Sequence, residues 1–278
     1  MFGKSISGLL VVIVAIFGTV GMKKETTDPN VITFTKENLI VLRGKVSEES
    51  VSPLVRQLQL RGDDPVYLFI HSPGGSVTAG NLLVDAIKAH KGKVTCYASE
   101  AISMAFVIFE SCHTRYVSQY SILMQHEASY SVEGPAPNNL AFITFLHGML
   151  KKMDQEQADR IGMSYEDFKK KTATDWWMDG VDAVSNHVAD KVVQASCTKD
   201  LTESGVPQHI ESMFMSLDVV WSGCPLVSYP VSIKSNQNDE HKKEFVKQLS
   251  EFYESYSAYI TDSKTVRELL DKSFIRIR

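Results

Sequence analysis

Apolar runs alternate with amphipathic stretches along roughly the first two thirds of the chain. Short runs dominated by apolar residues predict strands, most of them buried in a sheet; they are residues 39–42, 66–70, 94–98, 115–117 and 122–125. Between them, apolar residues three and four apart predict helices over 47–58 and 76–90. This strand–helix order predicts an α/β domain with a mostly parallel sheet covered on both faces.

Two further stretches predict helices with distinct roles. Residues 103–110 are apolar all round, so this helix should be buried. From residue 139 to about 160, apolar residues recur at spacings of three and four for about six turns. A helix of that length either projects to meet another subunit or packs on its own domain. The pattern alone leaves both open.

The N-terminus carries a separate apolar segment. Residues 6–20 contain no charge, with Lys4 before them and Lys23 and Lys24 after them. At about 15 residues the segment is short for a membrane-spanning helix and long for the apolar part of a signal peptide. We expect residues 1–25 to be a membrane anchor or signal peptide, with the catalytic part extracytoplasmic. A buried N-terminal helix is the alternative.

The strand–helix alternation stops after about residue 193. Residues 196–278 combine a stretch with serine and proline and a charged amphipathic run from residue 240 to about 259. We expect a helical extension of unknown role there. The chain therefore divides into the N-terminal segment 1–25, an α/β domain over 30–195 and an extension over 196–278.

Composition excludes some classes of function. A net charge of −4 over 278 residues provides no basic surface suited to nucleic acid. The four cysteines, Cys96, Cys112, Cys197 and Cys224, have no metal-ligand spacing, and neither a metal nor an organic cofactor is expected. Cys96 lies in an apolar run and reads as a small buried hydrophobic residue. A Cys197–Cys224 disulfide is expected only if that part leaves the cytoplasm.

Three features gather at the predicted carboxyl edge of the sheet, where sites form in parallel α/β folds. The sequence His-Ser-Pro-Gly-Gly-Ser over 71–76 ends one strand, Ser103 begins the buried helix, and His126 ends another strand. The glycines suit either a tight turn or a bare N–H that binds an oxyanion. Ser103 is either a helix cap or a nucleophile, and His126 either structural or a general base.

Several motifs, in order, resemble those of the Clp protease proteolytic subunit. The segment YLFIHSPGGSVTAG (67–80) resembles that family's SPGG signature, and AISM (101–104) its nucleophile segment. The segment ILMQH (122–126) resembles its histidine segment, and TATDWWM (172–178) its aspartate segment. The resemblance covers about residues 31–194. It implies a Clp protease/crotonase-like ββα superhelical core with the long helix as a projecting handle that interlocks subunits into homo-oligomeric rings.

The resemblance also implies a mechanism. Ser103 would be the nucleophile, His126 its general base and Asp175 the carboxylate that orients the imidazole. The N–H groups of Gly75 and Met104 would form the oxyanion hole, and the activity would be that of a serine endopeptidase on peptides or unfolded proteins. An ATPase partner is the family expectation in the cytoplasm, and an exported chain, which meets no ATP, argues against it.

Departures from the family pattern keep alternatives open. His71 replaces the family's asparagine, and residues 127–138 differ from its loop after the histidine. A Ser–His dyad would do without Asp175. A signal-peptide-peptidase-A-like enzyme would use a Ser–Lys dyad with Lys151 or Lys152. An enoyl-CoA-hydratase-like enzyme would need no Ser–His pair, and a catalytically silent scaffold would assemble without hydrolysis.

Overall fold

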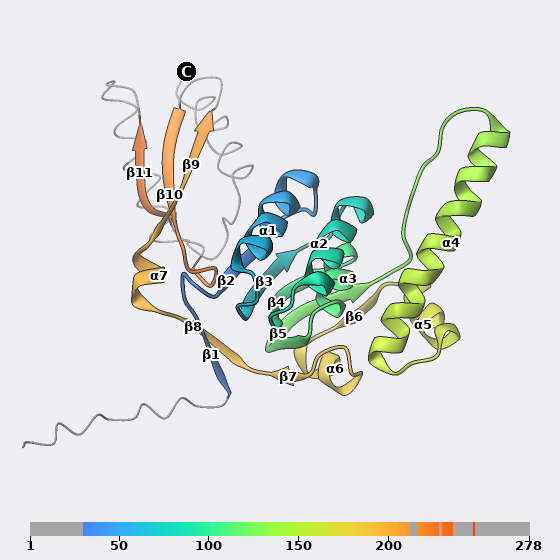
Figure 1. Ribbon diagram of the computed structural model, residues 1–278, viewed down its shortest axis with the longest axis horizontal. Coiled ribbons are helices and arrows are strands. Elements are labelled where there is room, and N and C mark those ends of the chain that lie inside the picture. The colour runs from blue at the N-terminus through green and yellow to red at the C-terminus, as the bar shows by residue number, and fades with distance from the viewer. Residues whose placement is uncertain (1–29, 212–215, 228–229, 236–246, 248–278) are drawn as a thin grey trace, which may run out of the picture.

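The computed structural model describes residues 30–211, 216–227, 230–235 and 247. Its centre is a six-stranded sheet in which the parallel strands β2 to β5 stand in chain order (Figure 1). β6 pairs antiparallel with the far end of β5, and β7 pairs parallel with its beginning. The strands are β2 (Leu39–Arg43), β3 (Val66–Ser72), β4 (Val94–Ile102), β5 (Thr114–Gln125), β6 (Trp176–Met178) and β7 (Lys191–Val192). The stretches 115–117 and 122–125, predicted as two strands, are one.

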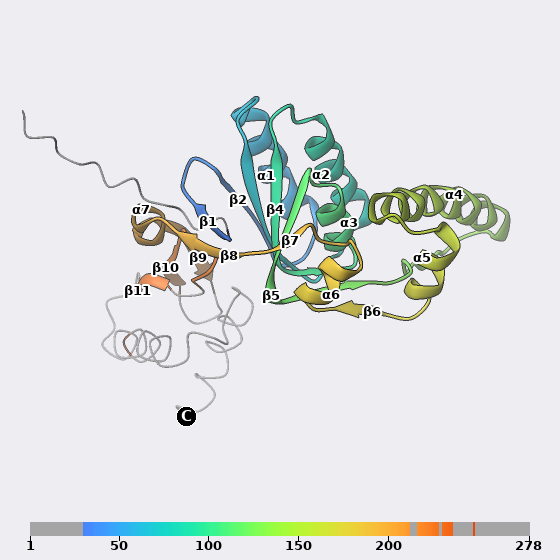
Figure 2. The same ribbon diagram turned by 90° about the horizontal axis from the view of Figure 1, so that it is seen from below.

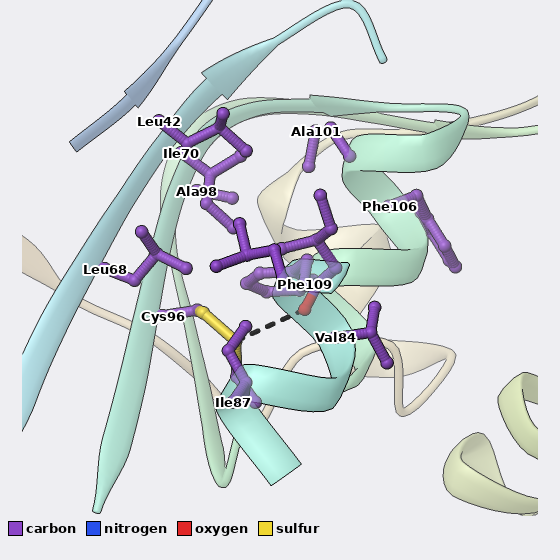
Figure 3. Close-up of a cluster of buried hydrophobic side chains, with 14 of the residues drawn as sticks. Leu42, Leu68, Ile70, Val84, Ile87, Cys96, Ala98, Ala101, Phe106 and Phe109 are labelled. Carbon is purple, nitrogen blue, oxygen red and sulfur yellow. Dashed lines mark hydrogen bonds between the residues drawn. A yellow bond between two sulfur atoms is a disulfide. The ribbon is translucent and has the colours of Figure 1, made fainter. Parts of the chain in front are cut away.

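One face of the sheet is covered by three helices: α1 (Glu48–Arg61), α2 (Val77–Ala89) and α3 (Met104–Glu110). Ser47 caps α1, and Glu48 and Glu49 occupy its first turn, where carboxylates are favoured by the helix dipole. Figure 3 shows side chains of strands β3 and β4 meeting those of α2 and α3 in one apolar cluster. Helix α3 corresponds to the helix predicted over 103–110. Its predicted burial is confirmed, since six of its seven residues are buried.

The other face is covered by a different part of the chain. Strands β1 (Val31–Phe34) and β8 (Gln194–Cys197) pair parallel with one another, and helix α7 (Lys199–Glu203) follows. Phe34 packs edge-on against Phe69 and Tyr97 of the sheet, with ring centroids 6.1 and 5.8 Å away. The alternating side chains of β3 and β4 thus enter two separate cores. The predicted double-sided burial is confirmed.

The long predicted helix is α4 (Ala136–Ile161). It leads away from the body of the protein, as Figure 1 shows, and only Gln157, Ala158 and Ile161 near its C-terminal end are buried. Gly162 ends it in the left-handed conformation, with φ 72°. Two shorter helices, α5 (Tyr165–Thr172) and α6 (Gly180–Ser185), return the chain to the sheet.

The prediction of a helical extension over 196–278 is wrong for the residues of that range that the structure describes. Apart from α7, that part forms an antiparallel sheet of β9 (Gly205–Glu211), β10 (Ser216–Ser222) and β11 (Pro230–Ser235), in the order β11-β10-β9. The physical reason is visible in β10, where Leu217, Val219 and Trp221 recur every second residue. This sheet and α4 lie at opposite ends of the protein (Figures 1 and 2). The charged run 240–259 falls almost wholly outside the described residues.

All four cysteines are paired. Cys197 bonds Cys224, which joins the end of β8 to the chain after β10. Cys96 is fully buried, as predicted, but it bonds Cys112 and is not a free thiol. The described residues include no helix with the length and apolarity needed to cross a membrane. The apolar segment 6–20 lies outside them.

Candidate active site

The carboxyl ends of β3, β4 and β5 bring the predicted residues together. The glycine pair follows β3, Ser103 follows β4, and His126 follows β5. Asp175 comes just before β6, and because β6 runs antiparallel to β5 and pairs Trp176 with Gln125, it starts at the same edge. Parallel neighbours in the sheet therefore place these chemically different side chains around one point.

Ser103 occupies a sharp turn between a strand and a helix. β4 ends at Ile102 and α3 begins at Met104, so Ser103 alone makes the turn, with φ 56° and ψ −121°. Its N–H donates to the carbonyl of Met124 over 2.8 Å, and its hydroxyl makes no cap bond to α3. Ser103 thus occupies the N-cap position of α3, but its hydroxyl does not cap the helix. Non-glycine residues at positive φ are strained, and such turns present a side chain prominently.

The Ser103 hydroxyl contacts the imidazole of His126 directly. Oγ and Nε2 are 2.8 Å apart, a hydrogen-bond distance. On the other side of the ring, Nδ1 lies 3.9 Å from Oδ1 of Asp175, which is an ion-pair distance but too long for a hydrogen bond. The Asp175 side chain is 56% exposed. Ser103 and His126 are thus brought together, with Asp175 nearby and not bonded to the ring.

The two glycines permit close approaches that no other residue would allow. Gly74 has φ +82°, and a Cβ there would lie 2.4 Å from the Ile102 carbonyl oxygen and 2.9 Å from the Met104 nitrogen. Gly75 has φ +149°, and its Cβ would lie 2.4 Å from the carbonyl oxygen of Val46. The Pro-Gly-Gly turn is therefore required both by backbone conformation and by contact with the Ser103 turn.

The backbone N–H groups of Gly75 and Met104 lie near this turn, and neither donates to a neighbouring strand or within α3. The N–H of Val46 donates to the Gly74 carbonyl and that of Ser76 to the Val46 carbonyl, each over 2.9 Å. This parallel bridge uses the residues on either side of Gly75, so the Gly75 N–H faces away from Val46. Met104, the first residue of α3, has no acceptor within its helix.

Ser103 and His126 line a cavity of about 460 Å³. Its apolar wall comes from the ends of α2 and α3 and from α4, through Val77, Met104, Val107, Leu150 and Met153. The charged part of the wall is a cluster of Glu127, Asp154 and Lys169. The Lys169 Nζ lies 2.6 Å from Oε1 of Glu127 and 3.3 Å from Oδ2 of Asp154.

A comparison with known protein families agrees with this geometry. The family model described as Clp protease matches residues 22–196. The chain therefore belongs to the Clp protease family. A curated relative, the ATP-dependent Clp protease proteolytic subunit 2 of Pseudomonas aeruginosa, is 27% identical over 164 residues, which cover 57% of this chain and 82% of the relative. Membership in the Clp protease family supports peptidase activity for this chain.

The Ser–Lys alternative is not favoured in this Clp protease. Lys151 lines the cavity, but its Nζ lies 5.6 Å from the centre of the Tyr165 ring. The side chain bonded to the Ser103 hydroxyl is His126. The silent-scaffold and hydratase-like alternatives are likewise not favoured by the family match. Within the described part of the chain, no group of three or more His, Cys, Asp or Glu side chains could hold a metal ion.

Several residues around the site were not identified as functional from the sequence. The buried amide of Gln125 donates to that of Gln157, which ties the end of β5 to α4, and Gln125 Oε1 accepts the N–H of His126 over 3.1 Å. Gln125 could have been noticed because it precedes His126. Gln157, Asp154 and Lys169 could not, because only the tertiary fold brings α4 and α5 beside β5.

Proposed function

We propose that this Clp protease is a serine endopeptidase that uses Ser103, His126 and Asp175. The single observation that carries the proposal is the 2.8 Å contact between Ser103 Oγ and His126 Nε2 at a strained turn. A serine hydroxyl is a weak nucleophile by itself and needs an adjacent base. Peptide hydrolysis by the wild-type protein beside its Ser103→Ala variant tests the proposal.

The geometry supports a two-step hydrolysis. His126 takes the Ser103 proton as Oγ attacks the scissile carbonyl carbon, and then gives that proton to the leaving amine as the peptide bond breaks. Water, deprotonated by the same imidazole, attacks the resulting ester; as the acyl–Oγ bond breaks, the imidazolium returns the proton to Ser103 Oγ and the second product leaves as a carboxylic acid. Asp175 stabilises the imidazolium across 3.9 Å, and this contact can tighten when substrate binds.

The oxyanion would be held by the N–H groups of Gly75 and Met104. Both stand beside the Ser103 turn, and neither has a ladder or helix acceptor. Donors fixed before the reaction stabilise the developing negative charge without reorganisation, and loss of one typically lowers the rate by about 10²–10³-fold. No metal or organic cofactor enters this mechanism.

We also propose that subunits assemble through α4, the handle of the family's rings. Leu140 and Phe145 on this helix are 68% and 66% exposed, and Phe142 is 48% exposed. Such apolar exposure on a projecting helix is typical of an interaction surface. Native mass measurement should give a homo-oligomer for wild type and a smaller species for Phe145→Asp. A wild-type monomer would contradict the proposal.

An extracytoplasmic location, with residues 1–25 as anchor or signal, is likewise our proposal. It is supported by the pairing of all four cysteines in disulfides, which persist in oxidising compartments. Protein isolated from its native source without reductant should show no thiol reactive towards maleimide when unfolded, and four after reduction. Free thiols before reduction would contradict it. The relative's name says ATP-dependent, and an exported chain would work without that dependence.

A further inference from the structure

The cavity beside Ser103 combines apolar walls with one charged cluster. Its aliphatic wall residues, among them Val77, Leu150 and Met153, suit the aliphatic stem of a long side chain. Asp154, Lys169 and Glu127 supply the charged part. A lysine or arginine side chain has the matching construction, because its stem is apolar and only its end is charged.

The cluster contains two carboxylates and one ammonium, so its net charge is −1 when all three groups are ionised. Lys169 is shared by two carboxylates, and its contact with Glu127, at 2.6 Å, is shorter than that with Asp154, at 3.3 Å. A carboxylate can accept about four hydrogen bonds. Within the described residues, Lys169 is the one partner found for Asp154. The remaining cation of the cavity wall, Lys151, has its Nζ near the Tyr165 ring.

Asp154 is also the more enclosed of the two acids. Its side chain is 22% exposed, against 55% for Glu127. Burial raises the pKa of Asp154, and the nearby Lys169 ammonium only partly opposes this. A second cation placed against Asp154 would offset both the desolvation and the repulsion from Glu127.

We propose that this cavity binds a lysine or arginine side chain of the substrate and that Asp154 pairs with its charge. The side chain would belong to the residue that supplies the scissile carbonyl, because Ser103 lines the same cavity. With the substrate cation in place, two carboxylates face two cations. The inference rests on the proposed peptidase activity and makes Asp154 a specificity-determining residue of it.

The test uses three peptides that differ only at that residue: lysine, norleucine, which keeps the stem without the charge, and glutamate. Wild type should cleave the lysine peptide with a kcat/KM about 10- to 100-fold above that for norleucine, as expected for a partly buried charged hydrogen bond. Glutamate should be the poorest. Asp154→Asn should bring the lysine-to-norleucine ratio close to one while norleucine cleavage persists, which shows that the variant is folded.

Asp159→Asn is the matched control. Asp159 lies on the same helix, is exposed, and does not line the cavity; its variant should keep the wild-type ratio. Equal cleavage of lysine and norleucine peptides by wild type would overturn the inference and leave the peptidase intact. So would an unchanged ratio in Asp154→Asn.

A second measurement separates selectivity from turnover. Peptide aldehydes ending in lysine or norleucine should protect Ser103 from a fluorophosphonate, with the lysine aldehyde effective at about tenfold lower concentration. Equal protection by the two aldehydes would overturn the inference even if no peptide is cleaved. Failure of the proposed function appears differently, as absence of Ser103 labelling in a folded protein, and the inference would fall with it.

Discussion

Replacing Ser103 by alanine should lower kcat for peptide hydrolysis by about 10⁴- to 10⁶-fold, and replacing His126 by alanine should lower it by a similar factor. The two side chains act as one unit, because the 2.8 Å contact moves the proton that makes Oγ a nucleophile. The double variant should therefore be no slower than either single variant. The residual rate would come from the backbone donors and from substrate binding.

The control for this prediction lies at the other end of the same helix. The Ser111 hydroxyl donates to the carbonyl of Ile108 over 2.6 Å and does not line the cavity of Ser103. Ser111→Ala should keep nearly full activity. Because Asp175 is exposed and 3.9 Å from the ring, Asp175→Asn should cost less than His126→Ala. Substantial hydrolysis by Ser103→Ala, measured in steady-state assays on purified protein, would remove the proposed nucleophile.

Replacing Arg115 by methionine should lower the free energy of unfolding by about 3–5 kcal/mol at pH 8. Arg115 lies between Glu110, at 2.6 Å, and Asp190, at 2.7 Å, and Glu110 is 4% exposed. Methionine keeps most of the stem but removes the charge, so Glu110 is left buried without its partner. Urea denaturation followed by circular dichroism measures the loss.

The same variant has a defined pH dependence. Burial raises the pKa of Glu110 to about 8, with the Arg115 guanidinium opposing the rise. The folded state therefore binds a proton more tightly than the unfolded state, and stability falls as pH rises from about 4.5 through about 8. Without Arg115 the pKa should rise further, so the destabilisation should be smaller at pH 5 than at pH 8.

An exposed ion pair provides the comparison. Lys88 and Glu156 are also 2.6 Å apart, but their side chains are 50% and 65% exposed. Lys88→Met should change the free energy of unfolding by less than about 1 kcal/mol. If Arg115→Met were as stable as Lys88→Met, the buried pair would have no structural importance.

Local patterns in the sequence were sufficient for most of the core. The strands β2 and β3, the first part of β4 and the buried helix α3 could be predicted because each is dominated by apolar residues. The extension of β4 from residue 99 to Ile102 was not predicted, because Ser99 and Glu100 are polar. The region after residue 196 was not predicted as strands, because the alternation in β10 is a weak signal by itself and the sheet forms only when its three strands pair with one another. The Cys96–Cys112 bond was not predicted either, since it joins the interior of β4 to the turn between α3 and β5.

The candidate site divides in the same way. Ser103 and His126 could be placed at one edge from their positions after strands, and the structure puts them in contact. The positive φ of Ser103 could not be predicted, because it depends on how its turn packs against Gly74. The separation of His126 from Asp175 could not be predicted either, because it depends on how β6 pairs with the end of β5. The charged cluster at Lys169 requires three elements to converge.

Mapping the adduct of a fluorophosphonate is the measurement that tests the central claim most directly. Wild-type protein would be labelled, digested and sequenced by mass spectrometry, beside Ser103→Ala and His126→Ala. The account predicts one adduct, on Ser103, absent from the first variant and formed far more slowly in the second. An adduct on another serine, or labelling of Ser103 that does not depend on His126, would contradict a Ser103–His126 peptidase.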